Sequence, residues 1–273
     1  MRVTLFGTRG SIPAPGPETV RYGGNTASVQ VCGKDGTVLV LDAGTGIRRL
    51  GMQVSPITHR IDILLTHLHM DHIQGLGFFG PLFDPRFKVH IWGPASSTLK
   101  LEARLARYLS PPLFPVHLRD MPKVVCHEVP CPSFEIGPFR IQNSLVCHPG
   151  PTVGYRIESE DGVVAYLCDH EPALGLLNGR WPSRDWISGY EVAWRPICSF
   201  MMLNTQMKSI NVASDGETVP TATLLNLRRR WVPNVLFRST TIPPTMTTRS
   251  IGYLKTPRIF SNALVSRLLE GRG

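Results

Sequence analysis

The chain has 273 residues, enough to bury one substantial hydrophobic core, and a formal net charge of +9. No run reaches the roughly 18 apolar residues of a membrane-spanning helix, and no leader precedes the strand-like residues 3–6, so we expect a cytoplasmic protein with no membrane contact. The positive charge is uneven. Residues 194–273 carry 11 Lys and Arg against 3 Asp and Glu, which leaves only +1 for residues 1–193. Any binding of nucleic acid must therefore be argued from a site rather than from the overall charge.

The first half of the chain alternates predicted strands and helices. Residues 27–31 alternate apolar and polar side chains, and a glycine-containing turn separates them from the apolar run 38–41, which predicts a hairpin. A short buried strand at 61–65 leads into a helix that starts near His72. A further strand at 88–93 precedes a helix at 96–109. This alternation is typical of an α/β protein.

The second half, as far as residue 167, is predicted to be mainly strands. Glycine and proline signals separate four apolar segments. These segments are 124–129, 139–146, 152–157 and 163–167. Two sheets flanked by helices therefore account for the pattern.

Three histidines and an aspartate lie within the seven residues 66–72, at the end of the predicted strand 61–65. In extended chain, His67 and His69 are two residues apart and point the same way. Asp71 and His72 lie on the following turn and can face a second ion. Imidazole and carboxylate groups without thiolates favour zinc, manganese or iron. The cluster therefore predicts a metal centre for two divalent cations, with zinc as the first choice.

Three polar residues at predicted strand ends are candidates to complete this centre. Asp42 follows the apolar run 38–41 and could accept a hydrogen bond from a ligand histidine, although an Asp at this position could also cap the next helix. Thr66 at the head of the cluster is expected to support the ligands as well. His148 and Asp169 each follow a predicted strand, which makes them candidate ligands.

The cluster carries a family resemblance. The stretch His67-Leu68-His69-Met70-Asp71-His72 resembles the HxHxDH signature of the metallo-β-lactamase superfamily. The segments 1–11, 21–26 and 41–46 resemble the opening of its ribonuclease Z-like and cyclic-nucleotide phosphodiesterase-like branch. The similarity covers residues 1–193. It implies an αββα sandwich, in which two mixed sheets are flanked by helices and the metal site lies at one rim.

The resemblance also implies a division of the ligands. His148 would join His67 and His69 on the first metal, and Asp169 would bridge to a second metal held by Asp71 and His72. Asp71 would in addition orient the attacking group as a base. The implied enzyme is a two-metal hydrolase in which a metal-bridging hydroxide attacks a phosphodiester, such as a cyclic nucleotide, another small phosphodiester or RNA.

Two other functions stay open. A thioester or lactam hydrolase of the same superfamily would use the same ligands. A non-catalytic or weakly active metal-binding remnant is the second alternative, because the family pattern requires one more histidine near the C-terminus and this chain has none after His170. His170 itself could substitute, although consecutive residues leaving a strand normally point apart. A homodimer is one assembly that we consider.

The sequence changes character at Trp194. Residues 194–273 are basic and lose both strand and helix periodicity, so we expect an irregular or disordered tail after an incomplete domain at 1–193. An out-of-frame tail is a specific hypothesis. Back-translation of residues 197–210, offset by one nucleotide, permits DLLIHDAQYTDEEY, which resembles the family's own continuation. The same offset around residues 239–249 permits HHDPxHxDDE, which resembles the missing histidine motif.

Overall fold

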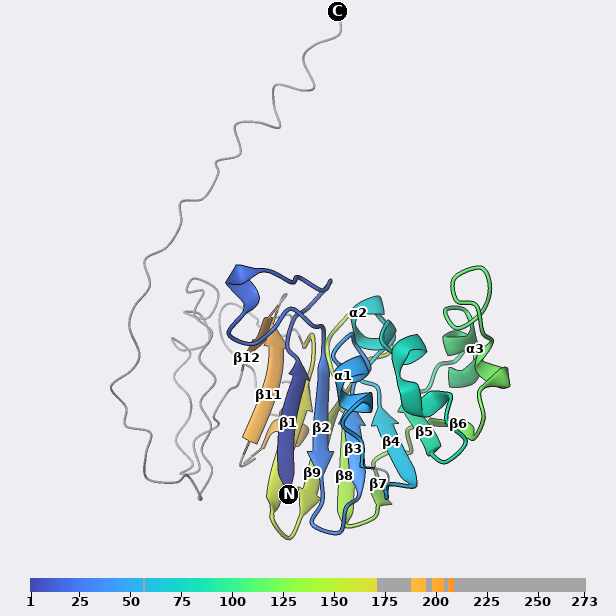
Figure 1. Cartoon of the computed structure of the whole chain (residues 1–273). Helices are drawn as coiled ribbons and strands as arrows, with labels where there is room; N and C mark the ends of the chain where they lie inside the picture. The colour runs from blue at the N-terminus through green and yellow to red at the C-terminus, as the bar shows by residue number, and fades with distance from the viewer. Residues whose placement is uncertain (56, 171–187, 195–197, 204–205, 209–273) are drawn as a thin grey trace, which may run out of the picture. The chain divides into compact units, whose positions relative to one another are not determined.

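The computed structural model describes residues 1–55, 57–170, 188–194, 198–203 and 206–208 (Figure 1). All of them lie in the first of two compact units, Met1–Arg238; the second unit, Ser239–Gly273, lies outside the described residues. Within the described ranges, no helix is both long enough and apolar enough to cross a membrane.

The first sheet has six strands in sequence order. β1, β2 and β3 are antiparallel neighbours, and β3, β4, β5 and β6 run parallel. The predicted turn after β2 forms, with Gly33 N donating to the Thr37 carbonyl and Gly36 at a positive φ of 87°. The strands are β1 (Arg2–Gly7), β2 (Ser28–Cys32), β3 (Val38–Leu41), β4 (Arg60–Leu64), β5 (Lys88–Gly93) and β6 (Val124–Glu128).

The second sheet also has six strands, in the order β12-β11-β10-β9-β8-β7. β7, β8, β9 and β10 are joined as antiparallel hairpin neighbours. β8 and β10 therefore run in the same direction, with β9 between them. The strands are β7 (Ser133–Ile136), β8 (Phe139–Leu145), β9 (Val153–Ser159), β10 (Gly162–Leu167), β11 (Cys198–Leu203) and β12 (Gln206–Lys208).

β11 and β12 lie in the segment that was expected to be irregular. β11 pairs parallel to β10, and β12 pairs antiparallel to β11. The expectation is wrong for these nine residues, because Phe200-Met201-Met202-Leu203 is an apolar run and β10 offers an open edge with unpaired backbone groups. The remainder of the predicted tail lies outside the described residues.

Helices cover the outer faces of both sheets, as the αββα prediction requires. α1, α2 and α3 pack on the first sheet around a core that includes Val40, Ile63 and Leu105. α4 contacts β8, β9 and β10 of the second sheet. The helices are α1 (Ile47–Gly51), α2 (Met70–Ile73), α3 (Leu101–Ala106) and α4 (Tyr190–Ala193), with short 3-10 turns η1 (Pro17–Thr19), η2 (Leu76–Phe78), η3 (Gly80–Leu82) and η4 (Leu118–Asp120).

A second core lies between the sheets. Val29 and Leu41 of the first sheet and Ile141 and Tyr155 of the second are all buried there, as period-2 alternation predicts. The predicted αββα sandwich is therefore confirmed.

Two helices are shorter than their patterns predicted. The helix expected over 96–109 is regular only in α3. The helix after the histidine cluster, α2, ends because Gly75 N leaves it to donate to the Ala43 carbonyl. A Cβ on Gly75 would lie 2.1 Å from the Gly44 carbonyl oxygen. This close approach holds the turn after α2 against the residues that follow β3.

Candidate metal centre

The histidine cluster lies where β4 ends and α2 begins (Figure 1). His69 is still extended, with φ −66° and ψ 152°, and forms the N-cap of α2. Because His67 and His69 therefore project to the same side, His67 Nε2 lies 2.9 Å from His69 Nδ1. His67 is buried and His69 is exposed. The cluster is thus anchored at one end and open to solvent at the other.

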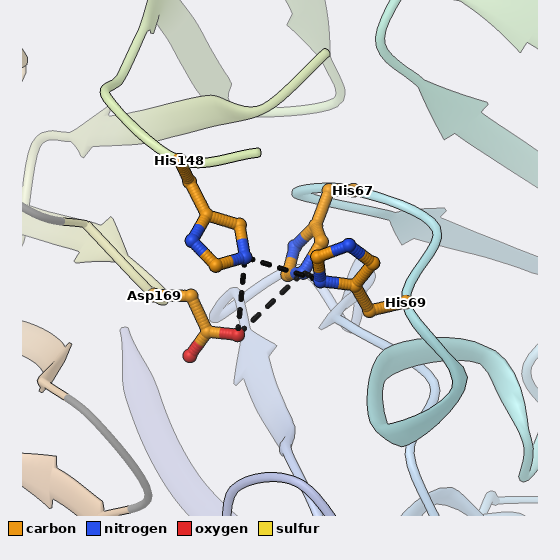
Figure 2. A group of neighbouring side chains, drawn as sticks. All are labelled: His67, His69, His148 and Asp169. Atoms are coloured by element: carbon orange, nitrogen blue, oxygen red, sulfur yellow. Dashed lines mark hydrogen bonds and ion pairs between the residues drawn. The ribbon is translucent and has the colours of Figure 1, made fainter. Parts of the chain in front are cut away.

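His148 follows β8 and Asp169 follows β10. Figure 2 shows that their side chains converge with those of His67 and His69. His148 Nε2 lies 3.1 Å from His69 Nδ1. Asp169 Oδ2 lies 3.5 Å from His67 Nε2 and 3.8 Å from His148 Nε2. One ligand atom from each of the four residues lies within 4.8 Å of all the others.

A second group shares Asp169. It contains Asp71, His72 and Asp169, whose ligand atoms also lie within 4.8 Å of one another. His72 Nε2 lies 3.1 Å from Asp169 Oδ2 and 3.4 Å from Asp71 Oδ2. Asp169 therefore belongs to both groups, so its carboxylate would be shared if two neighbouring cations were bound.

The contacts among the imidazoles fit a bound cation. His69 Nδ1 faces His67 Nε2 and His148 Nε2, and one ring nitrogen has either one proton or one lone pair to share between them. A metal ion would instead accept a lone pair from each nitrogen. The nitrogen and oxygen donors without thiolate suit zinc, manganese or iron. The fold family implies divalent metal ions, and this donor set fits them.

The protonation states of His67, His69 and Asp71 suit metal binding, which requires neutral imidazoles and ionised carboxylates. Burial lowers the pKa of His67 to about 2 and also lowers the pKa of His69. Burial alone would raise the pKa of Asp71, but hydrogen bonds from His72 and from the Ser11 N–H lower it well below its usual range. Burial opposes charge on His72, yet nearby carboxylates, Asp42 first, raise its pKa well above the ordinary value. A divalent cation would take the place of that proton on His72 Nε2.

Asp42 lies behind His72, where β3 ends. Its Oδ2 is 2.8 Å from His72 Nδ1, so the opposite nitrogen of the ring faces Asp169. Asp42 also accepts hydrogen bonds from the Thr66 N–H, the Thr66 hydroxyl and the Tyr166 hydroxyl. Asp42, at the end of β3, is therefore the centre of a buried hydrogen-bond network.

Thr66 links this network to the first ligand group. Its hydroxyl lies 2.9 Å from Asp42 Oδ2 and 3.0 Å from His67 Nδ1. Both Asp42 and Asp169 have a positive φ, 57° and 54°, which is uncommon for residues other than glycine and recurs at functional sites. The turn after β10 sends Asp169 into the cluster and His170 away from it.

His170 does not join the ligands. Its Nε2 lies 2.7 Å from the Ser188 hydroxyl, and its Nδ1 is buried and has no hydrogen-bond partner among the described residues. Sequence reasoning missed Ser188, Tyr166 and Ser11. The Ser11 N–H donates to Asp71 Oδ2 at 2.7 Å, from a backbone with φ 68°. The alternation along β10 points Tyr166 between the sheets, but no local signal marks Ser11 or Ser188 as a neighbour of the cluster.

Two further histidines, the buried His90 and the half-buried His127, form a pair away from the cluster. His90 Nδ1 lies 2.7 Å from His127 Nε2, the two rings are nearly coplanar, and Trp92 stacks on His127. The indole N–H of Trp92 in turn donates to Asp62. This pair is part of the packing at the β4-β5-β6 side of the sandwich.

We expect His90 to make the fold sensitive to acid. Burial lowers the pKa of His90 to about 4, whereas an unfolded histidine titrates near about 6.5. Since the unfolded chain binds the proton first, stability should fall as the pH drops from about 6.5 to 4. A His90→Gln variant should lose part of that decline in urea unfolding measured with a chelator present. The exposed His59→Gln is the matched control, and equal pH profiles for His90→Gln and the parent would contradict the prediction.

Comparison with known proteins is consistent with this geometry. A family model described as a beta-lactamase superfamily domain matches residues 37–189, more than half of the chain. The chain belongs to the metallo-β-lactamase superfamily. A ribonuclease Z of Mycobacterium bovis is 30% identical over 193 residues, which cover 64% of this chain and 65% of that protein. A ribonuclease Z of Methanopyrus kandleri is 31% identical over 128 residues, 45% of this chain and 41% of that protein.

Both of these relatives are named ribonuclease Z, and this chain spans less than two thirds of their length. Among solved structures, the short form of human tRNase Z is 22% identical, with a TM-score of 0.45, over 62% of this chain and 70% of that one. A diphosphatase of the PhnP family is 22% identical, with a TM-score of 0.46, over 61% of this chain and 64% of that one.

Proposed function

We propose that this protein is a metal-dependent hydrolase of phosphodiester bonds, acting on RNA or on small phosphodiesters such as cyclic nucleotides. The observation that supports this most is the shared carboxylate. Asp169 belongs both to the group with His67, His69 and His148 and to the group with Asp71 and His72. Two cations that share a ligand can stabilise both the attacking and the departing oxygen of a phosphoryl centre.

The residues divide into three tasks. His67, His69 and His148 would hold the first cation, Asp71 and His72 the second, and Asp169 both. Bound divalent cations would lower the pKa of a water molecule and neutralise charge developing on phosphoryl oxygens. Asp71 is kept ionised by the Ser11 N–H and His72, so its carboxylate can orient a water molecule and accept its proton. Asp42 and Thr66 hold the rings of His72 and His67 from behind.

The relatives and the charge distribution support the proposed substrate class. The matched curated relatives are named ribonuclease Z, which supports RNA as one substrate. Residues 1–193 are almost neutral, so recognition of a polyanion would depend on the cations themselves. A small phosphodiester can bind at the cations alone, without an extended basic surface around them. Both substrates remain part of the proposal.

Turnover assays with two model substrates test the function. With zinc or manganese added, the full chain should hydrolyse bis-p-nitrophenyl phosphate and leave a thioester intact. His69→Ala, which removes an exposed ligand, should be inactive, whereas His59→Ala on the exposed surface should match the parent. Thioester turnover without phosphodiester turnover would overturn the proposal in favour of the other hydrolase class.

The out-of-frame tail is a second proposal, and it concerns how complete the site is. The family match ends at residue 189, close to the predicted break at 193, and no histidine follows His170. If the tail is out of frame, the second cation lacks a ligand and the chain is a weakly active, metal-binding remnant. Sequencing of the coding DNA across codons 185–215 tests the idea directly.

Restoring the alternative frame gives a functional prediction. A chain that carries both DLLIHDAQYTDEEY and HHDPxHxDDE in the alternative frame from the break onward should bind close to two zinc ions. It should also turn over phosphodiesters faster than the chain described here, because its second cation gains the final histidine. Metal content per chain and steady-state rates measure both effects. Equal zinc content and equal rates for the two chains would contradict the prediction.

The homodimer and the cytoplasmic location stay predictions. Analytical sedimentation measures the first and cell fractionation the second.

A further inference from the structure

Ser188 lies between the two segments that deliver His148 and Asp169. The Cys147 N–H donates to the Ser188 hydroxyl oxygen at 3.0 Å. The same oxygen lies 2.7 Å from His170 Nε2. Cys147 precedes His148, and His170 follows Asp169. One hydroxyl group therefore contacts the immediate neighbours of two candidate ligands.

The sheet itself does not link these two segments. β8 and β10 end at the same rim, but β9 lies between them. Neighbouring strands are about 4.8 Å apart, so the two strand ends are separated by roughly 9.6 Å, too far for a direct backbone hydrogen bond. The Ser188 hydroxyl spans this gap from outside the sheet.

The hydroxyl group is needed whichever His170 nitrogen carries the proton. A serine oxygen can accept the Cys147 N–H and at the same time donate to an unprotonated His170 Nε2, or accept from a protonated one. In the described part of the chain this is the one hydrogen bond of the His170 ring, because its Nδ1 has no partner. An alanine at position 188 would remove the hydroxyl group, so the Cys147 N–H and the His170 ring would each lose a hydrogen bond.

The position of Ser188 is set by its surroundings. Gly189, the next residue, has a φ of 72°, and a Cβ there would lie 2.8 Å from Leu167 and 2.9 Å from Val146. α4 follows at once and buries Val192 against the second sheet. The backbone at 188 is thereby held close to the ends of β8 and β10, so its hydroxyl has a defined place.

We propose that Ser188 is a positioning residue that sets the spacing between His148 and Asp169, and through it the metal affinity of the centre. The proposal rests on the metal centre of the proposed function. It assigns Ser188 no contact with substrate. Groups that orient metal ligands from behind typically change metal affinity by about 10–100-fold when removed.

Metal affinity of the full chain tests the role. Ser188→Ala should weaken zinc binding by about 10–100-fold in competition with a chromophoric chelator. Its cobalt(II) absorption spectrum should also change, because the ligands around the ion move. The melting temperature without metal should fall by roughly 2–4 °C, because the Cys147 N–H and the His170 ring each lose a hydrogen bond. Ser144→Ala, which removes a hydroxyl from β8, is the matched control and should leave affinity and spectrum unchanged.

An isosteric pair separates the hydroxyl from packing. Ser188→Thr and Ser188→Val have nearly the same shape, so both keep or lose the fold together, and only threonine retains the hydroxyl. We expect tighter zinc binding by the threonine variant. Equal affinities for this pair would overturn the proposal, as would parental affinity and spectrum in Ser188→Ala. Zinc binding that depends on Ser188, in a parent without phosphodiester turnover, would overturn the proposed function alone.

Discussion

Replacement of Asp169 by alanine is expected to abolish phosphodiester hydrolysis and to remove metal from both ligand groups. Asp169 Oδ2 lies within 3.8 Å of ring nitrogens of His67, His72 and His148, so its loss affects every part of the centre. The drop in rate should exceed the roughly 10–100-fold that follows loss of a group acting only through a ligand. Zinc content after gel filtration and turnover of bis-p-nitrophenyl phosphate measure the two effects.

The matched control for Asp169→Ala is Asp120→Ala. Asp120 is exposed, and its ion pair with Arg119 spans 3.8 Å at the surface, where such pairs contribute about 0–1 kcal/mol. It should keep parental zinc content and rate. If Asp169→Ala keeps the zinc content of the parent, the carboxylate does not bridge the two groups. If it loses zinc but keeps its rate, the metal does not serve the reaction.

Replacement of Asp42 by asparagine is expected to weaken both the fold and the metal centre. Asp42 is fully buried and its carboxylate interacts with Thr66, His72 and Tyr166. Asparagine keeps the shape but turns one acceptor into a donor, so at least one buried donor loses its partner, at a cost of about 1–3 kcal/mol. The ring of His72 would also lose the charge that orients it, so zinc affinity should fall by about 10–100-fold.

Urea unfolding without metal and zinc titration separate the two effects of Asp42→Asn. Tyr166→Phe is the comparison, because it removes one donor to Asp42 and leaves the carboxylate and the His72 contact in place. Its loss of stability should be about 1 kcal/mol and its zinc affinity close to that of the parent. An Asp42→Asn chain with parental zinc affinity would show that Asp42 only stabilises the fold.

Local sequence patterns predicted the elements that carry the centre. The apolar run at 61–65 and the residues after it predicted a strand, a turn and a helix, and β4 and α2 lie there. The spacing of His67 and His69 placed both side chains on one side of an extended chain, as the 2.9 Å contact between their rings shows. Such features depend on neighbours within a few residues, so periodicity is sufficient to predict them.

Local patterns were less reliable where backbone contacts from elsewhere decide the conformation. The helix after the cluster was expected to run on from His72, but α2 ends early because Gly75 packs against Gly44 and bonds to Ala43. The segment containing β11 was expected to be irregular, yet it pairs with the open edge of β10. In both cases a partner distant in sequence competes with the local preference.

The sequence by itself determined the superfamily signature, the strand and turn that present His67, His69, Asp71 and His72, and the donor chemistry. The strand ends and the resemblance also made His148 and Asp169 candidates, but only the tertiary structure decided which residues meet the cluster. His148 and Asp169 come from two strands separated by β9, Ser11 reaches Asp71 from a loop after β1, and Ser188 joins the two strand ends. The physical reason is that sheet order and layer packing set these distances, and neither leaves a mark in the local spacing of residues.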